Sequence, residues 1–123
     1  MTMLTTFAPP ARQAVIRAGL LASEGGMSRL SDGYLLLALA ESQPLTRPVD
    51  LGVTAITLNE GGRKVIEVAR WVSRRGHRTQ VTREDLLWGL LADASSESVG
   101  ILRHCRVDIG RLWADLRRWY QSA

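Results

Sequence analysis

Two stretches decide the fold: Leu30-Ser-Asp-Gly-Tyr-Leu-Leu-Leu-Ala-Leu39 and Val81-Thr-Arg-Glu-Asp-Leu-Leu-Trp-Gly-Leu90. Both end in Leu-Leu, a variable apolar residue, a small residue and Leu. The offset that superposes them also pairs three further positions: Phe7 with Leu58, Arg12 with Arg63, and Gly25 with Gly76. Self-similarity at one fixed period over so many positions indicates an internal repeat.

Apolar residues recur at helical spacing in both copies, so each copy predicts a pair of helices. The expected helices are residues 9–24 and about 32–42 in the first copy, then about 60–75 and a helix capped by Thr82 in the second. Two further helices are expected to begin near Ser95 or Ser96 and after Asp108. Residues 44–57 predict a loop with at most one helical turn near residues 48–51.

The size of the chain argues against two separate domains. Each half of the 123 residues is too small to bury its apolar helix faces alone, so the copies should pack on each other. We therefore expect one all-α domain over residues 1–123. Repeat one covers about residues 7–56 and repeat two about 58–120.

The formal charge of +4 is unevenly distributed, at −1 for residues 1–60 and +5 for residues 61–123. A basic half is typical of solvated helix faces, and also of proteins that bind nucleic acid or an acidic partner. The alternative function is therefore a small basic nucleic-acid-binding or regulatory protein, although no recognition helix is evident. The arginines concerned are Arg70, Arg74, Arg75, Arg78 and Arg83.

The ordered motifs resemble the Clp amino-terminal domain, the double Clp repeat found in the ClpC, ClpA and ClpB unfoldases. The motifs are the opening Phe7-Ala-Pro-Pro-Ala-Arg12, the helix end Gly76-His77, the two Leu-Leu-x-small-Leu helices, and Val99 to Asp108. The resemblance covers about residues 4–117. It implies a bundle of about seven to eight short helices with pseudo-twofold symmetry. No ATP-binding Gly-x-x-x-x-Gly-Lys loop is present, so the chain is similar to the receptor module without the motor.

The resemblance also implies where segments of other proteins would bind. In some family members a Thr-Glu pair begins each Leu-Leu helix, and these pairs form pockets for phosphoarginine. A carboxylate there grips the guanidinium, and helix amides hold the phosphate. The matching positions here are Asp32-Gly33 and Arg83-Glu84, so only Glu84 keeps the acid. We expect phosphoarginine binding to be lost, with Glu84 serving as a first-turn acid.

A second family surface is apolar and accepts adaptors and, in actinobacterial members, cyclic peptides. It maps to Leu4, Phe7 and Leu58. The competing interpretation is that Phe7 and Leu58 only anchor helix starts in the core.

The last helix carries a possible second interface. Interfaces are enriched in aromatic residues and arginine, which favours a partner surface at Trp119, Tyr120 and Arg117. The alternative is a loosely covered tail that packs on the domain.

No arrangement typical of an enzyme is present, and no cofactor or metal is expected. The adjacent His104 and Cys105 point about 100° apart on a helix, so they do not converge, and Cys105 is expected to be buried. Residues 1–6 lack the features of a signal peptide, and no membrane span is evident. We expect a cytoplasmic, non-catalytic module that binds proteins or peptides, as an adaptor, decoy or sequestering partner in a Clp unfoldase system. Its partners would be the unfoldase, its substrates or adaptors, or cyclic peptides.

Overall fold

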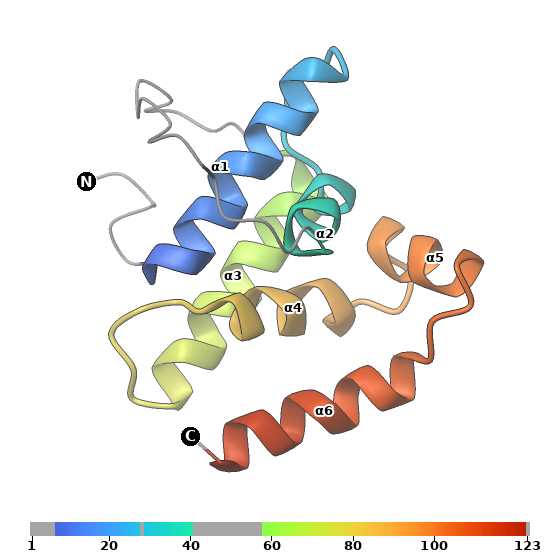
Figure 1. The fold of residues 1–123 in the computed structure, drawn as a ribbon. Helices are drawn as coiled ribbons and strands as arrows, with labels where there is room; N and C mark the ends of the chain where they lie inside the picture. The colour runs from blue at the N-terminus through green and yellow to red at the C-terminus, as the bar shows by residue number, and fades with distance from the viewer. Residues whose placement is uncertain (1–6, 28, 41–57, 123) are drawn as a thin grey trace.

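The structure is a computed structural model that describes residues 7–27, 29–40 and 58–122. These residues form six helices: α1 (Pro9–Glu24), α2 (Asp32–Ala40), α3 (Glu60–Arg75), α4 (Arg83–Ala92), α5 (Glu97–His104) and α6 (Ile109–Ser122) (Figure 1). The predicted all-α class is therefore confirmed, as a fold of six helices within the described part of the chain. The predicted helical turn near residues 48–51 lies outside these ranges.

Side chains at the helix starts explain why the helices begin where the sequence predicts. Asn59 accepts a hydrogen bond from the Gly62 N–H at 2.8 Å, which caps α3. Thr82 and Asp85 form a reciprocal capping box at α4, with 3.2 Å from Asp85 N to Thr82 Oγ1 and 2.9 Å from Thr82 N to Asp85 Oδ2. Such caps satisfy backbone N–H groups that the first helical turn leaves without partners.

The two copies are joined by matching backbone contacts. Phe7 forms a parallel bridge with Val81, and Leu30 forms one with Leu58. The Ala8 N–H donates to the Val81 carbonyl at 2.8 Å, and at the equivalent position of the second copy the Asn59 N–H donates to the Leu30 carbonyl at 3.0 Å. Each copy thus pairs its opening segment with the segment that precedes the Leu-Leu helix of the other copy. The backbone contacts of the two copies are thus reciprocal at these positions.

The core lies where α2 and α4 pack against each other and against α1 and α3. Phe7, Leu35, Leu86 and Leu90 are fully buried there. Gly89 allows the closest approach, because a Cβ at this position would lie 2.5 Å from the Val65 carbonyl oxygen of α3. The small residue of the repeated motif is therefore required by the packing of α3 on α4.

The last two helices have no described counterpart in the first copy. α5 packs against α2 and α4, and α6 runs along α4 on the side away from α2 (Figure 1). Within the described residues no helix is long and apolar enough to cross a membrane.

The predicted burial of Cys105 is wrong. Cys105 is the C-cap of α5, and its thiol is exposed. The next residue, Arg106, has φ 60° and turns the chain away toward α6, so this turn lies outside the core. Trp88 of α4 is half-buried, and its ring packs edge to face against Trp113 of α6.

Candidate functional site

The first-turn residues of α2 and α4 do not form a matched pair of sites. Asp32 of α2 is only 4% exposed, and its Oδ2 accepts from the Ser98 N–H at 2.9 Å and the Ser98 hydroxyl at 2.7 Å. Both contacts hold the start of α5 against α2. Asp32 therefore has a structural role that sequence analysis did not predict.

Glu97 of α5 occupies the space in front of Gly33. A Cβ on Gly33 would lie 2.8 Å from Glu97 Oε1, so the absence of a side chain at position 33 makes room for this carboxylate. Position 33 of the first copy carries Gly where the second copy carries Glu84. The structure supplies a carboxylate from α5, a helix that belongs to the second copy.

A cavity of about 220 Å³ lies beside Glu97, at the junction of α2, α3, α4 and α5. Its lining residues are Asp32, Glu60, Gly61, Lys64, Val65, Gly89, Asp93, Ser96 and Glu97. Four of these carry carboxylates and one carries an ammonium group. The volume is below the range of about 300 to 1,000 Å³ that is typical of small-molecule sites, so the cavity suits one side chain. The complementary group is a cation, such as a guanidinium or an ammonium.

Local hydrogen bonds keep this cavity acidic. The Ser95 hydroxyl and the Ser95 N–H both donate to Asp93, at 2.6 and 2.9 Å, and hold the pKa of Asp93 below its usual value. Lys64 lies 4.0 Å from Glu60, but both side chains are largely exposed. Exposed pairs of this kind interact weakly, and the four carboxylates outnumber the one ammonium group at the cavity. No group of three or more His, Cys, Asp or Glu side chains in the described ranges is placed to hold a metal ion.

In the second copy, Arg83 at the start of α4 makes a contact within the fold. Arg83 donates from Nη2 to the Leu39 carbonyl at 2.6 Å, which ties α4 to the end of α2. Glu84 is half-buried beside it. Arg83 therefore supports the packing of the copies on each other rather than a matching pocket.

A buried carboxylate next to Glu84 fastens α6 to the domain. Asp85 is fully buried and accepts two hydrogen bonds from Arg78, at 2.8 and 2.7 Å. It also accepts from the Tyr120 hydroxyl at 2.6 Å. The bidentate carboxylate holds the pKa of the Arg78 guanidinium above its usual value. Burial and Asp85 together raise the pKa of the Tyr120 phenol.

The predicted apolar surface is largely internal. Phe7 is fully buried in the core, and Leu58 is half-buried against it. The burial of Phe7 is what the interpretation as an anchor for a helix start predicts. Leu4 lies outside the described residues.

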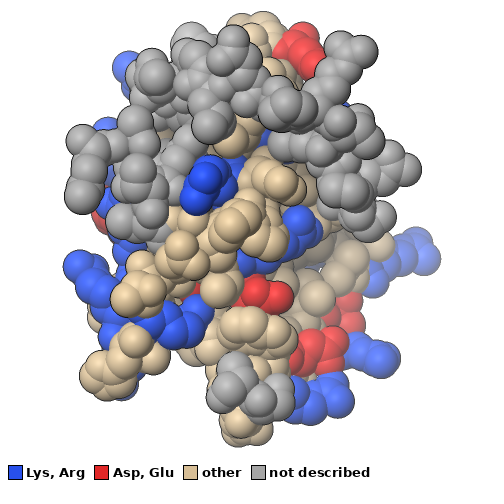
Figure 2. Space-filling model, turned by 60° about the vertical axis from the view of Figure 1, so that its left-hand side comes forward, with Lys and Arg blue, Asp and Glu red and all other residues tan. Residues whose placement is uncertain are grey.

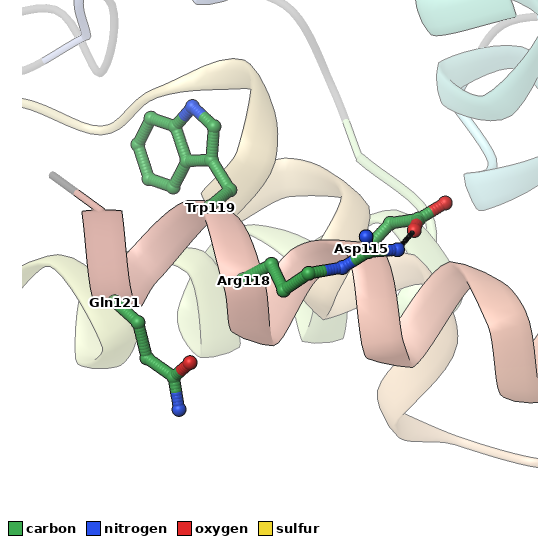
Figure 3. Close-up of a pocket in the computed structure, with 4 residues that line it drawn as sticks. All are labelled: Asp115, Arg118, Trp119 and Gln121. Carbon is green, nitrogen blue, oxygen red and sulfur yellow. Dashed lines mark hydrogen bonds and ion pairs between the residues drawn. The ribbon is translucent and has the colours of Figure 1, made fainter.

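Of the predicted second interface at the end of α6, Tyr120 contacts the rest of the domain and Arg117 faces solvent. Tyr120 is bound to Asp85, and its ring is perpendicular to that of Trp119 at 4.9 Å between centroids. Arg117 is exposed. A shallow, open hollow lies beside Trp119, and the close-up in Figure 3 shows Trp119 and Gln121 on opposite sides of the helix. The side chains do not converge, so no chemical site forms there.

The basic surface of the alternative function is smaller than the sequence suggests. Arg78 and Arg83 are engaged with Asp85 and Leu39, while Arg74 and Arg75 are exposed on α3. The guanidinium of Arg75 lies 5.0 Å from the ring centroid of Trp71. On the face shown in Figure 2, the visible Lys and Arg side chains are spread among acidic and uncharged ones.

Comparison with known proteins identifies the fold. No family model and no curated protein matches the sequence. Among solved structures, the N-terminal domain of the caseinolytic protease associated chaperone ClpD from Arabidopsis thaliana matches with a TM-score of 0.74 and 19% identity, over 93% of this chain and 96% of that one. A structure from preliminary investigations of a malarial protein secretion system matches with a TM-score of 0.72 and 17% identity, over 96% and 97% of the two chains. The chain therefore has the fold of the Clp amino-terminal domain.

Proposed function

We propose that this chain is a non-catalytic module that binds segments of other proteins within a Clp unfoldase system in the cytoplasm. The observation that carries the proposal is the fold, which follows the ClpD amino-terminal domain over 93% of the chain. The role is that of an adaptor, a decoy or a sequestering partner, and it needs binding alone. The two matched structures share little sequence with the chain, so its own side chains must define what it binds.

The acidic cavity beside Glu97 is the proposed contact point for the bound segment. Its carboxylates come from α2, α3, α5 and the C-cap of α4, so both copies and α5 must be folded for the cavity to exist. A protruding arginine or lysine would enter it and replace water around several carboxylate oxygens with charge-assisted hydrogen bonds. The rest of the segment would lie over the rim and be sequence-tolerant.

The binding step is tested with short labelled peptides that differ in one central residue: arginine, lysine or citrulline. Fluorescence anisotropy with the full chain should show tighter binding for arginine and lysine than for the neutral citrulline. The preference should weaken as salt increases, since exposed charges are screened. Glu97→Gln should lower affinity for the arginine peptide by about tenfold, the loss of one charged hydrogen bond.

Glu67→Gln is the matched control. Glu67 is exposed on α3 and does not line the cavity, so this variant removes the same charge elsewhere. Equal affinity for arginine and citrulline peptides, or an equal effect of the two variants, would refute the assignment of the cavity.

The role in a Clp system is tested separately with a Clp unfoldase–protease pair and a fluorescent substrate. An adaptor would raise the rate of substrate degradation, whereas a decoy or sequestering partner would lower it. If the rate is unchanged at saturating protein, and no unfoldase or substrate is captured, the chain acts outside this system.

A further inference from the structure

The outer face of α4 shows how a helix docks on one copy of this repeat. Trp88 of α4 meets the rings of Trp113 and Tyr120 of α6 edge to face, at 5.4 and 5.3 Å between centroids. The Arg78 guanidinium lies 5.4 Å from the Tyr120 ring centroid, and Asp85 holds the Tyr120 hydroxyl. In the second copy, α6 thus contacts Arg78, Asp85 and Trp88.

The same three positions exist in the first copy as Met27, Tyr34 and Leu37. The repeat offset holds through the intervening turns, because the Met27 N–H donates to the Ala22 carbonyl at 2.9 Å as the Arg78 N–H donates to the Ser73 carbonyl at 3.0 Å. The residues before them also match, with φ 76° at Gly26 and φ 55° at His77. We call Met27, Tyr34 and Leu37 the copy-one face.

After its Leu-Leu helix, the first copy has a shorter stretch of chain than the second. In the second copy α5 and α6 together occupy the chain from Glu97 to Ser122. In the first copy only residues 41–59 separate α2 from α3. The stretch between α2 and α3 is therefore shorter than the one that carries α5 and α6.

The copy-one face is apolar and open to solvent. Met27 is 50% exposed and Leu37 is 49% exposed, and these are two of the four large hydrophobic residues that the described ranges expose. Tyr34 is half-buried. The charged Arg78 and Asp85 of the second copy are replaced here by neutral side chains. A ligand for this face must therefore be apolar, without the hydrogen-bonding hydroxyl that α6 presents to Asp85.

We propose that the copy-one face binds an amphipathic helix of a partner protein, which docks on α2 as α6 docks on α4. The partner helix carries large aromatic or aliphatic residues at the spacing that Trp113, Leu116 and Tyr120 have on α6, one apolar stripe along the helix. This surface goes beyond the proposed function, because none of its three residues lines the acidic cavity. A basic segment and a helix can occupy the chain at the same time.

The probe is a synthetic peptide of residues 108–122 with Phe in place of Tyr120, which removes the hydroxyl that Asp85 would select. Binding to the full chain is measured by anisotropy of the labelled peptide and by amide shifts in NMR spectra. Saturable binding is expected, with shifts at Met27, Tyr34 and Leu37. Leu37→Lys should weaken binding by at least about tenfold, as for a central apolar contact.

Trp71→Lys is the matched control, because Trp71 is also 49% exposed but lies on α3. It should leave binding unchanged, and Met27→Lys should repeat the effect of Leu37→Lys. The proposal fails if binding does not saturate, if both Leu37 and Trp71 variants bind alike, or if the shifts fall on Asp85 and Trp88.

Two other occupants would also be recognised. If the free chain is a dimer that Leu37→Lys dissociates, a second copy covers the face. If Leu37→Lys alone lowers the melting temperature by several degrees, the chain's own residues 41–57 cover it. Either result overturns the assignment to a partner helix.

Discussion

The two copies of the repeat agree in their cores and differ in what surrounds the Leu-Leu helix. α1 and α3 are both 16 residues long, and α2 and α4 follow them after turns of the same length. Around α4 the chain adds a buried ion pair and α6, whereas around α2 it leaves Met27 and Leu37 exposed. The backbone contacts between the copies are therefore matched, whereas the burial of their opening residues and the outer faces of their Leu-Leu helices differ.

The largest expected effect separates the two opening residues. Phe7→Ala should lower the free energy of unfolding by about 4 kcal/mol, because it empties a fully buried site. Leu58→Ala, at the equivalent but half-buried position, should cost about 2 kcal/mol. Urea unfolding followed by circular dichroism measures both. If the two losses differ by less than about 1 kcal/mol, the scale of one buried methylene, then Phe7 and Leu58 are not buried to different extents.

The next effect concerns the ion pair that only the second copy has. Asp85→Ala should cost about 3 kcal/mol, because it leaves Arg78 and the Tyr120 hydroxyl without their shared partner. Near-ultraviolet circular dichroism should also change, as Trp88 loses its ordered contact with α6. Glu84→Ala is the neighbouring control and should cost under about 0.5 kcal/mol. Similar losses for the two variants would mean that Asp85 does not fasten α6.

A smaller effect is expected at the first turn of α2. Asp32→Ala removes the one oxygen that accepts both hydrogen bonds from the fully buried Ser98, which should cost about 2 kcal/mol and increase hydrogen exchange in α5. Asp115→Ala, which breaks only the exposed contact with Arg118, should change stability by less than about 0.5 kcal/mol. Unchanged exchange in α5 would show that other contacts hold this helix.

The smallest effect depends on pH. Burial first, and then Asp85, raise the pKa of Tyr120 above that of a free phenol. The stabilisation is therefore complete below about pH 10, the ordinary value, and is lost as the pH rises through the raised folded-state value. Tyr120→Phe should cost about 1 kcal/mol at neutral pH, and this gap should narrow above about pH 10. Melting temperatures of both proteins over that range measure it, and a constant gap would contradict a raised pKa of Tyr120 in the folded state.

Sequence patterns predicted the helices well, because their signals are local. Prolines at the start of α1, the caps Asn59 and Thr82, and the glycines after α1 and α3 act within a few residues. The constant offset between the two copies added the long-range information that they pack together. It did not distinguish a core role from a surface role for Phe7, because an apolar residue before a helix serves either.

The acidic cavity could not be predicted from the sequence. Glu60, Asp93 and Glu97 are ordinary helix-end acids by pattern, and only the packing of α3, α4 and α5 brings them to one cavity with Asp32. Similarly, the sequence predicts Tyr120 as an interface residue. Its partner Asp85 lies 35 positions away, so no local pattern connects the two. Positions that interact between helices carry no periodic signal of their own.

The reciprocal backbone hydrogen bonds between the two copies constrain how such a protein could have arisen. A chain with one copy would leave its opening N–H and the carbonyl before its Leu-Leu helix without the partners that Ala8, Val81, Leu30 and Asn59 provide for one another. A second molecule would have to supply them, as in a swapped homodimer. Joining two such molecules through residues 41–57 turns a concentration-dependent assembly into a single chain that folds at any dilution.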